Sequence, residues 1–103
     1  MTAYEEPTRV QIYEEDWEHV KIASALSRGT PAQNMGGDMI AALVAEPLEQ
    51  PLTNPTGPVK RRAVWIRLPV AAREAVDKIR EEDPDATWSR LLHAAVLKDQ
   101  QRS

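Results

Sequence analysis

The residues of this chain whose types and spacing could do chemistry are basic, and three of them are consecutive. Lys60, Arg61 and Arg62 stand just before an alternating stretch that contains Arg67. The chain has 103 residues and a formal charge of −3. Its first 56 residues hold three basic and nine acidic groups, a charge of −6, whereas the rest hold ten basic and seven acidic groups, a charge of +3. Such a split can mark one surface for a polyanion, although ordinary surface variation explains it equally well.

Patterns typical of catalysis or metal binding are missing from the sequence. The chain has no cysteine, which excludes disulfides and thiolate metal sites. His19 and His93 lie far apart in the sequence, so we expect ordinary surface or core histidines. The acidic run Glu14, Glu15 and Asp16 is typical of a helix start rather than of a metal site. Without a Ser/His/Asp set or a glycine-rich phosphate loop, we expect no enzyme, no metal and no other cofactor.

Composition also bounds the location and the number of domains. No apolar run of about 18 residues occurs, so we expect no transmembrane span and no membrane partner. The N-terminus MTAYEEPTRV is acidic and lacks the apolar region of a secretory signal. The simplest expectation is a cytoplasmic protein with a single domain.

A proline-rich stretch divides the chain into two similar segments. Four prolines fall between residues 47 and 60: Pro47, Pro51, Pro55 and Pro58. Proline at that density prevents a helix and favours an extended connector. We therefore expect a linker over 47–60 between two segments of about 40 residues, each too short to fold alone.

The second segment predicts a strand, a helix, a turn and a second helix. Val64, Ile66 and Leu68 fall on one face of a strand, and Ala63, Trp65 and Arg67 fall on the other. Pro69 suits the first position of a helix, and Glu82–Asp85 breaks that helix. Thr87 or Asp85 can cap the next helix. Its apolar stripe consists of Trp88, Leu91, Leu92, Ala95 and Val96.

The first segment repeats this order. Alternation places Val10 and Ile12 on one face of a strand, and Arg9, Gln11 and Tyr13 on the other. A helix should follow and end at Gly29. Thr30 should cap the next helix, with Pro31 at its first position. Gly36–Gly37 either permits a close helix crossing or marks a helix that begins near Asp38.

A lone strand in each segment leaves its backbone groups unpaired. If the two strands pair antiparallel, four helices can pack around one shared core. We therefore expect a mainly α fold with a two-stranded antiparallel ribbon. The expected parts are a flexible N-terminus over 1–7, a first unit over 8–46, the linker over 47–60, a second unit over 61–99 and a tail over 100–103.

The run VWIRLPVAAREAVDKI, followed by TWSRLLHAAV, resembles the ribbon-helix-helix family of DNA-binding proteins, which includes the Arc and MetJ types. The resemblance is good over 62–97 and weaker over 8–46. Members of this family are usually intertwined homodimers. The resemblance implies two ribbon-helix-helix units in tandem, intertwined around one core as a single-chain, monomeric pseudo-dimer that could assemble further on DNA.

The resemblance also implies a function and its residues. The ribbon would enter the major groove of double-stranded DNA, and an asymmetric ribbon should read an asymmetric site. Arg67 would suit guanine and Gln11 would suit adenine. The implied base contacts are Arg9, Gln11, Tyr13, Trp65 and Arg67; the implied phosphate contacts are Lys60, Arg61, Arg62, Thr30, Thr87 and Ser89. The expected role is a transcriptional repressor or an accessory factor of a plasmid, phage or conjugative element.

Several alternatives remain open in the sequence. Trp65 could pack on a thymine methyl, or it could contact a protein partner in a module that keeps the fold without binding DNA. Arg67 could be a solvated strand residue, and Lys60–Arg62 could be a solvated linker end. A true homodimer, in which only the second half forms the ribbon, is also compatible with the sequence.

Overall fold

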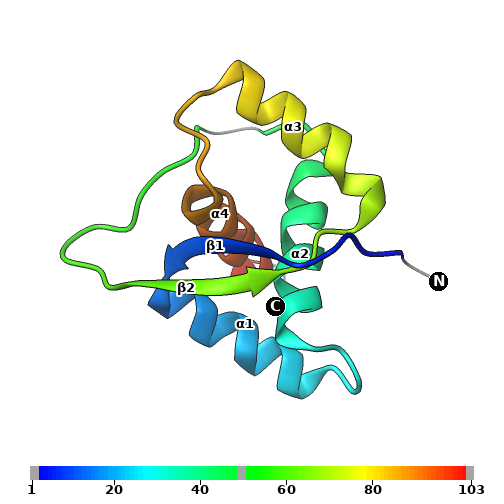
Figure 1. The fold of residues 1–103 in the computed structure, drawn as a ribbon. Helices are drawn as coiled ribbons and strands as arrows, with labels where there is room; N and C mark the ends of the chain where they lie inside the picture. The colour runs from blue at the N-terminus through cyan, green and yellow to red at the C-terminus, as the bar shows by residue number, and fades with distance from the viewer. Residues whose placement is uncertain (1–2, 49–50, 102–103) are drawn as a thin grey trace.

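The chain folds into two short strands and four helices, and the computed structural model describes residues 3–48 and 51–101 (Figure 1). The prediction of a mainly helical fold with a two-stranded antiparallel sheet is confirmed. In chain order the elements are β1 (Thr8–Tyr13), α1 (Glu14–Leu26), α2 (Ala32–Val44), β2 (Arg61–Ile66), a 3-10 turn (Val70–Ala72), α3 (Arg73–Glu82) and α4 (Trp88–Gln101). The described residues between Val44 and Arg61 form neither helix nor strand.

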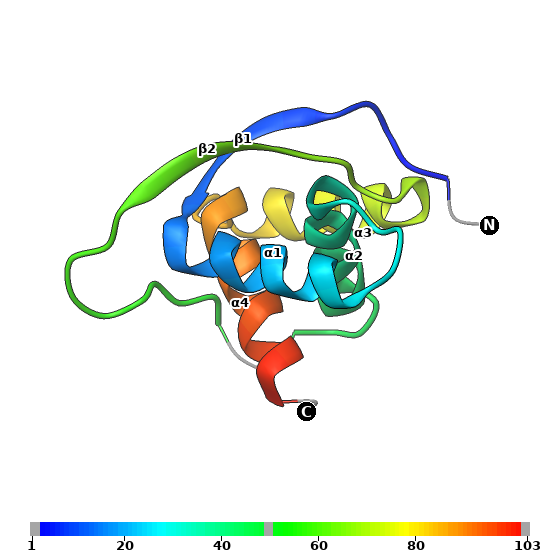
Figure 2. The ribbon, with the colours of Figure 1, turned by 90° about the horizontal axis from the view of Figure 1, so that it is seen from below.

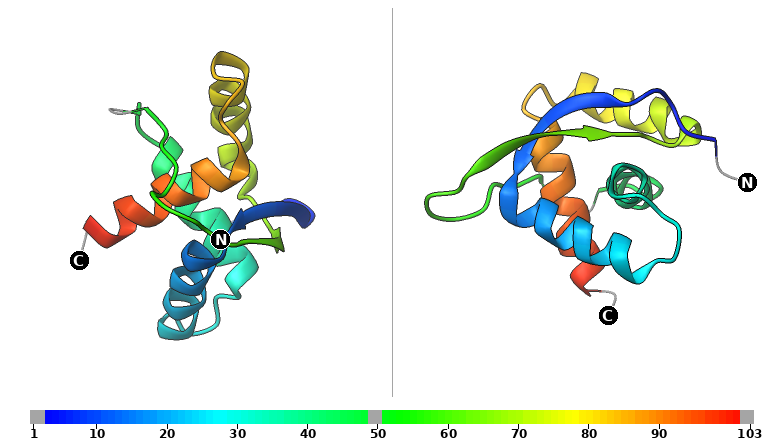
Figure 3. Two further views of the ribbon diagram at one scale, coloured as in Figure 1. Left: turned by 90° about the vertical axis from the view of Figure 1, so that its left-hand side faces the viewer. Right: turned by 60° about the horizontal axis from the view of Figure 1, so that its bottom comes forward.

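The two strands pair along their whole length, with Thr8 opposite Ile66 and Tyr13 opposite Arg61. Because side chains alternate along each strand, the ribbon has an inner and an outer face. The inner face buries four aliphatic side chains, Val10, Ile12, Val64 and Ile66. Figures 2 and 3 show the ribbon crossing one side of the helices, which lie against its inner face.

The second helix of each half contacts the strand of the other half. Helix α4 packs against β1, α2 packs against β2, and α2 and α4 pack against each other. The resulting core draws on both halves. Its largest fully buried side chains are Ile12, Ile40, Leu91, Leu92, Val20 and Val76. Neither half therefore has a core of its own.

The starts of α2 and α4 differ in how they are capped. Thr87 Oγ1 accepts a hydrogen bond from the backbone N–H of Arg90 at 3.3 Å, which confirms the predicted cap of α4. The predicted cap at Thr30 is wrong, because α2 begins at Ala32 and Pro31 occupies the capping position without a side-chain bond. The carbonyl of Thr30 instead accepts a hydrogen bond from Ser24 Oγ, which ties this residue to the end of α1.

Helix α2 runs without a break through Gly36 and Gly37, so it does not begin near Asp38. At Gly37 it lies directly against the backbone that follows β2: a Cβ built there would be 1.9 Å from the carbonyl oxygen of Arg67. The backbone N–H of Arg67 also donates to the carbonyl of Gln33 at 3.1 Å. A residue without a side chain is therefore required for α2 to meet the end of the ribbon.

Both ends of the chain differ from the expected boundaries. Residues 3–7, which we expected to be flexible, continue the ribbon: Glu5 N donates to Leu68 O, and Val70 N donates to Ala3 O, both at 2.9 Å. Helix α4 extends to Gln101, so the expected tail over 100–103 is partly helical. Residues 1–2 and 102–103 lie outside the described residues.

Pro69 precedes the first helical turn rather than occupying it, because the 3-10 turn begins at Val70. Within residues 3–48 and 51–101, every helix is too short or too polar to cross a membrane.

The two glycines of α2 provide a matched test of this packing. We expect Gly37→Ala to lower the free energy of unfolding by about 2–3 kcal/mol, because the new methyl group must displace backbone. At Gly36 the nearest atom to a new Cβ is Cζ3 of Trp17 at 3.4 Å. Gly36→Ala should therefore be close to neutral, since alanine favours the helix by roughly 1 kcal/mol over glycine. Urea unfolding of both variants measures this, and equal effects would contradict the close approach.

Candidate nucleic-acid interface

The middle of the outer face of the ribbon carries four side chains, which we call the central quartet: Arg9, Gln11, Ala63 and Trp65. The strand register pairs Arg9 with Trp65 and Gln11 with Ala63. Arg9 and Gln11 are exposed, and Trp65 is 50% exposed, whereas Ala63 is half-buried. The quartet therefore combines a cation, an amide and an aromatic ring on one surface. Arg9, Gln11 and Trp65 lie where the sequence predicted them.

One end of the ribbon is basic. Lys60, Arg61 and Arg62 are all exposed there, at the start of β2. The Lys60 carbonyl accepts the backbone N–H of Glu14 at 2.9 Å, which fixes the cluster beside the start of α1. Arg61 lies on the outer face, with its guanidinium carbon 5.6 Å from the centre of the Tyr13 ring. The cluster is thus attached to the ribbon rather than to a free linker end.

Tyr13 does not belong to the outer surface, contrary to the sequence prediction. It is only 3% exposed. Its hydroxyl donates to Asn54 Oδ1 at 2.7 Å, and its ring meets that of His93 edge-on at 6.0 Å. Strand alternation correctly assigned Tyr13 to the outer-face register of β1. It could not predict that this last position of β1 lies over the first half of α4, which covers the Tyr13 side chain. As a base contact, Tyr13 is excluded in this conformation by its burial.

Below Tyr13 lies a buried contact between an aspartate and a histidine that the sequence did not suggest. Asp16 is 6% exposed, and its Oδ2 lies 3.1 Å from Nδ1 of His93. Burial raises the pKa of the Asp16 carboxyl, and the hydrogen bond from His93 opposes that rise. A second pair joins His19 to Asp99 at 2.8 Å. Each histidine therefore has a carboxylate partner distant in sequence, which only the packing of α1 on α4 creates.

The other end of the ribbon holds Arg67, just beyond β2. Its side chain is half-buried, and its Nε donates to the backbone carbonyl of Glu5 at 3.0 Å. Its guanidinium carbon lies 5.9 Å from the centre of the Tyr4 ring. Arg67 is therefore not a freely solvated strand residue. The contacts with the N-terminal residues were missed because nothing in the sequence spacing relates them to β2.

The predicted phosphate contacts at the starts of α2 and α4 lie near opposite ends of the ribbon. Helix α4 begins near the basic end, where Arg90 Nε and the hydroxyl of Tyr13 share Asn54 Oδ1. Helix α2 begins near Arg67, where Thr30 is half-buried. Thr87 is exposed, but Ser89 is 6% exposed and its hydroxyl lies 3.0 Å from that of Thr87. Because the Ser89 side chain is buried, a phosphate contact at Ser89 would have to come from its backbone N–H.

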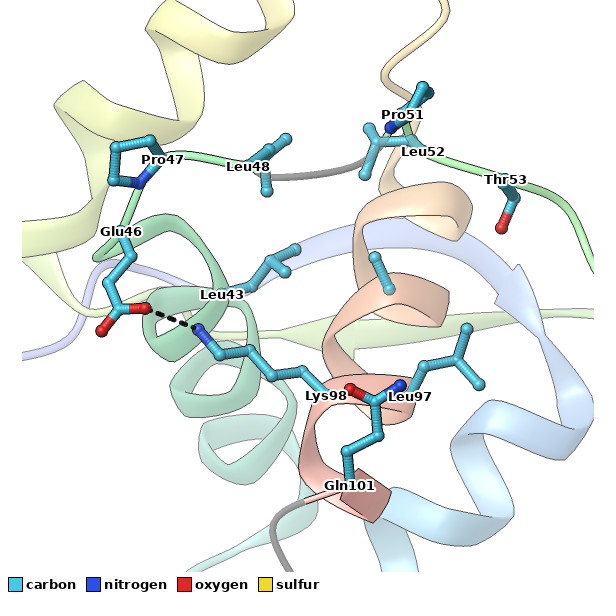
Figure 4. Close-up of a pocket in the computed structure, with 11 residues that line it drawn as sticks. Leu43, Glu46, Pro47, Leu48, Pro51, Leu52, Thr53, Leu97, Lys98 and Gln101 are labelled. Carbon is cyan, nitrogen blue, oxygen red and sulfur yellow. Dashed lines mark ion pairs between the residues drawn. The ribbon is translucent and has the colours of Figure 1, made fainter.

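A pocket of about 290 Å³ lies between the ends of α2 and α4 and the linker, on the side of the helices away from the ribbon (Figures 2 and 4). Leucines supply much of its apolar lining: Leu43, Leu48, Leu52 and Leu97. Its charged residues, Glu46 and Lys98, pair with each other at 3.7 Å. Among the described residues, no group of three His, Cys, Asp or Glu side chains could hold a metal ion. The outer face of the ribbon thus remains the strongest candidate site.

In comparisons with protein-family models, curated proteins and solved structures, nothing matches this chain.

The Asp16–His93 pair predicts a specific pH dependence. A raised pKa in the folded state means that folding favours the protonated carboxyl, so this stabilisation is full below the unfolded pKa of about 3.9 and is lost as pH rises through the folded pKa. Asp16→Asn removes that titration. We expect the stability of the variant relative to the wild type to increase as the pH is raised from about 4. Urea unfolding over a pH series measures it, and a constant or opposite difference would contradict the assignment.

Proposed function

We propose that the chain binds double-stranded DNA by placing the outer face of its β1–β2 ribbon in the major groove. The observation that supports this most is the central quartet with an arginine at each end, Arg61 and Arg67, on a ribbon whose other face is buried in the core. A two-stranded ribbon fits the width of the major groove. A ribbon with an uncovered outer face can approach the base edges without unfolding.

The polar side chains of this face suit base recognition. The forks of Arg9 and Arg67 match the O6 and N7 acceptors of guanine, and the amide of Gln11 matches adenine. Trp65 presents an apolar ring that can pack on a thymine methyl. Tyr13 is left out of this set because it is buried.

The basic end of the ribbon suits the DNA backbone. Lys60, Arg61 and Arg62 are exposed beside the start of α4, where Thr87 and the first backbone N–H groups of the helix lie. Cations and helix starts both favour phosphate. At the other end, Thr30 remains a candidate through its neighbouring backbone. The chain thus offers its phosphate contacts mainly at one end.

We also propose that the two halves form a tandem ribbon-helix-helix pseudo-dimer, in which one chain supplies what two subunits supply in the family it resembles. The packing supports this proposal, because α2 of the first half packs on β2 of the second half, and α4 of the second half packs on β1 of the first half. The two strands differ in sequence, so the site they read should lack two-fold symmetry. A repressor, or an accessory factor of a plasmid, phage or conjugative element, would use such a site.

A second candidate function is binding of a partner protein through Trp65. Two observations favour it: the Trp65 ring is 50% exposed at the surface, and the chain has a net charge of −3, which opposes long-range attraction to DNA. Exposed aromatic residues are typical anchors of protein interfaces. The two functions differ in which residue of the quartet is essential.

Fluorescence anisotropy with short labelled duplexes from around the chain's own gene, at low and high salt, tests the DNA proposal. We expect tight, salt-sensitive binding to one duplex, because counterions are released from contacted phosphates. Arg9→Ala should weaken that binding about tenfold, since a bidentate base contact is worth about 1–3 kcal/mol. Lys98→Ala is the matched control, because Lys98 lies in the pocket lining on the side of the helices away from the ribbon.

Equal losses in Arg9→Ala and Lys98→Ala, or binding no tighter than to random duplexes, would contradict the DNA proposal. If instead Trp65→Ala alone removes binding to a purified partner protein while Arg9→Ala does not, the second function is favoured.

A further inference from the structure

The residues before β1 form an arm that continues the ribbon past its regular end. Tyr4 pairs with Pro69 as an antiparallel bridge, and Thr8 pairs with Ile66. Three residues lie between these pairs on the arm, Glu5 to Pro7, but only Arg67 and Leu68 lie opposite them. This extra residue is the feature of a β-bulge, which bends a strand and redirects nearby side chains.

Side chains fix this arm at two points. The hydroxyl of Tyr4 donates to both carboxylate oxygens of Asp38 in α2, at 2.8 and 3.0 Å. The carboxylate of Glu5 accepts hydrogen bonds from the guanidinium of Arg73, with Nε 3.1 Å from each oxygen. The Arg73 guanidinium holds the pKa of the Glu5 carboxyl below its usual value. The arm is therefore tied both to α2 and to the start of α3.

The arm in turn fixes the guanidinium of Arg67. The Tyr4 ring lies under the guanidinium, and the Glu5 carbonyl accepts its Nε–H. Within the described part of the chain, the terminal Nη1 and Nη2 atoms of Arg67 make no hydrogen bond or ion pair. These two nitrogens are the end of the fork that binds O6 and N7 of guanine. The arm thus occupies the stacking face and the Nε–H, and leaves the recognition edge free.

Arg61, at the opposite end of the ribbon, is held by fewer contacts than Arg67. It also lies over a tyrosine, Tyr13, at 5.6 Å, but it is exposed and its side chain makes no hydrogen bond within the described part of the chain. Arg67 has both a ring contact and a hydrogen bond, and it is half-buried. The two ends of the ribbon therefore present arginines that differ in burial and in the number of contacts that hold them.

We propose that Tyr4 and the backbone of Glu5 are positioning residues for Arg67, which hold its guanidinium ready for a single guanine. This inference rests on the proposed DNA function. An arginine that is already oriented loses less freedom on binding than a solvated one. The reading of that guanine therefore depends on the arm, although no arm side chain needs to touch the base.

A double-mutant cycle tests this on the full chain and on the best duplex selected from a random pool by the wild type. In the wild-type background, Tyr4→Leu should weaken binding about tenfold, close to the effect of Arg67→Ala. In the Arg67→Ala background, Tyr4→Leu should have no further effect. Tyr4→Phe is the matched control, because it keeps the ring under Arg67 and loses only the bond to Asp38. Thermal melting shows that each variant is folded.

Base analogues provide a readout that a merely structural role would not change. Replacing guanines of the duplex one at a time by 7-deazaguanine removes the N7 acceptor. One such replacement should weaken the wild type about tenfold but leave both Tyr4→Leu and Arg67→Ala unaffected. Tyr4→Phe should retain the wild-type response, because its ring still supports the guanidinium.

The outcomes separate this inference from the function on which it rests. If the wild type selects no duplex above random DNA, the proposed function fails and the inference fails with it. If the wild type selects a duplex but the effects of Tyr4→Leu and Arg67→Ala are additive, only the positioning role is overturned. Tighter binding by Tyr4→Leu would also overturn it, because the arm would then withhold Arg67 from DNA.

Discussion

The pairing of two six-residue strands, one from each half of the chain, is the interaction on which the rest of this structure depends. Each strand alone would leave its backbone groups unpaired and its apolar face exposed. Paired, β1 and β2 bury four aliphatic side chains against helices from both halves. Because α2 packs on β2 and α4 packs on β1, loss of the pairing would disrupt both halves together. The linker over 47–60 serves to make this long-range pairing intramolecular.

A ribbon buried on one face and uncovered on the other has a direct consequence for function. Its inner face fixes the register, since a slip by one residue would move the apolar side chains to solvent. The same register holds Arg9 opposite Trp65 and Gln11 opposite Ala63 on the outer face. The central quartet is therefore positioned by the packing of the inner face against the hydrophobic core. Its two ends differ: one has three exposed basic residues, and the other has a single arginine held by the N-terminal arm.

Much of this fold could be predicted from periodicity, because the deciding forces are local. Alternation identified both strands and their inner faces, and Thr87 marked the start of α4. The errors occur where distant segments meet. Tyr13 has the alternation of an outer residue, but α4 covers it. The contact of Gly37 with the backbone of Arg67 could not be predicted, because it joins α2 to residues thirty positions further along.

In the candidate site, too, the sequence predicted positions along the strands but not contacts between distant segments. Arg9, Gln11 and Trp65 lie on the outer face as expected, because strand alternation alone places them there. The surroundings of Arg67 were not foreseen, since an acidic, proline-containing N-terminus has no feature that predicts a bulged continuation of β1. Ser89 was implied as a phosphate contact by the resemblance, but its side chain is buried by tertiary packing that the sequence did not indicate.

The most direct test of the central claim is an NMR titration of the isotope-labelled chain with the duplex that it binds best. The chain has three tryptophans, whose indole N–H groups give separate signals. We expect the Trp65 indole and the backbone amides of Arg9 and Gln11 to shift on addition of DNA. The indole of Trp17, which is buried in the core, should stay unchanged. Shifts confined to the helices, with the Trp65 signal unmoved, would contradict recognition of DNA by the ribbon.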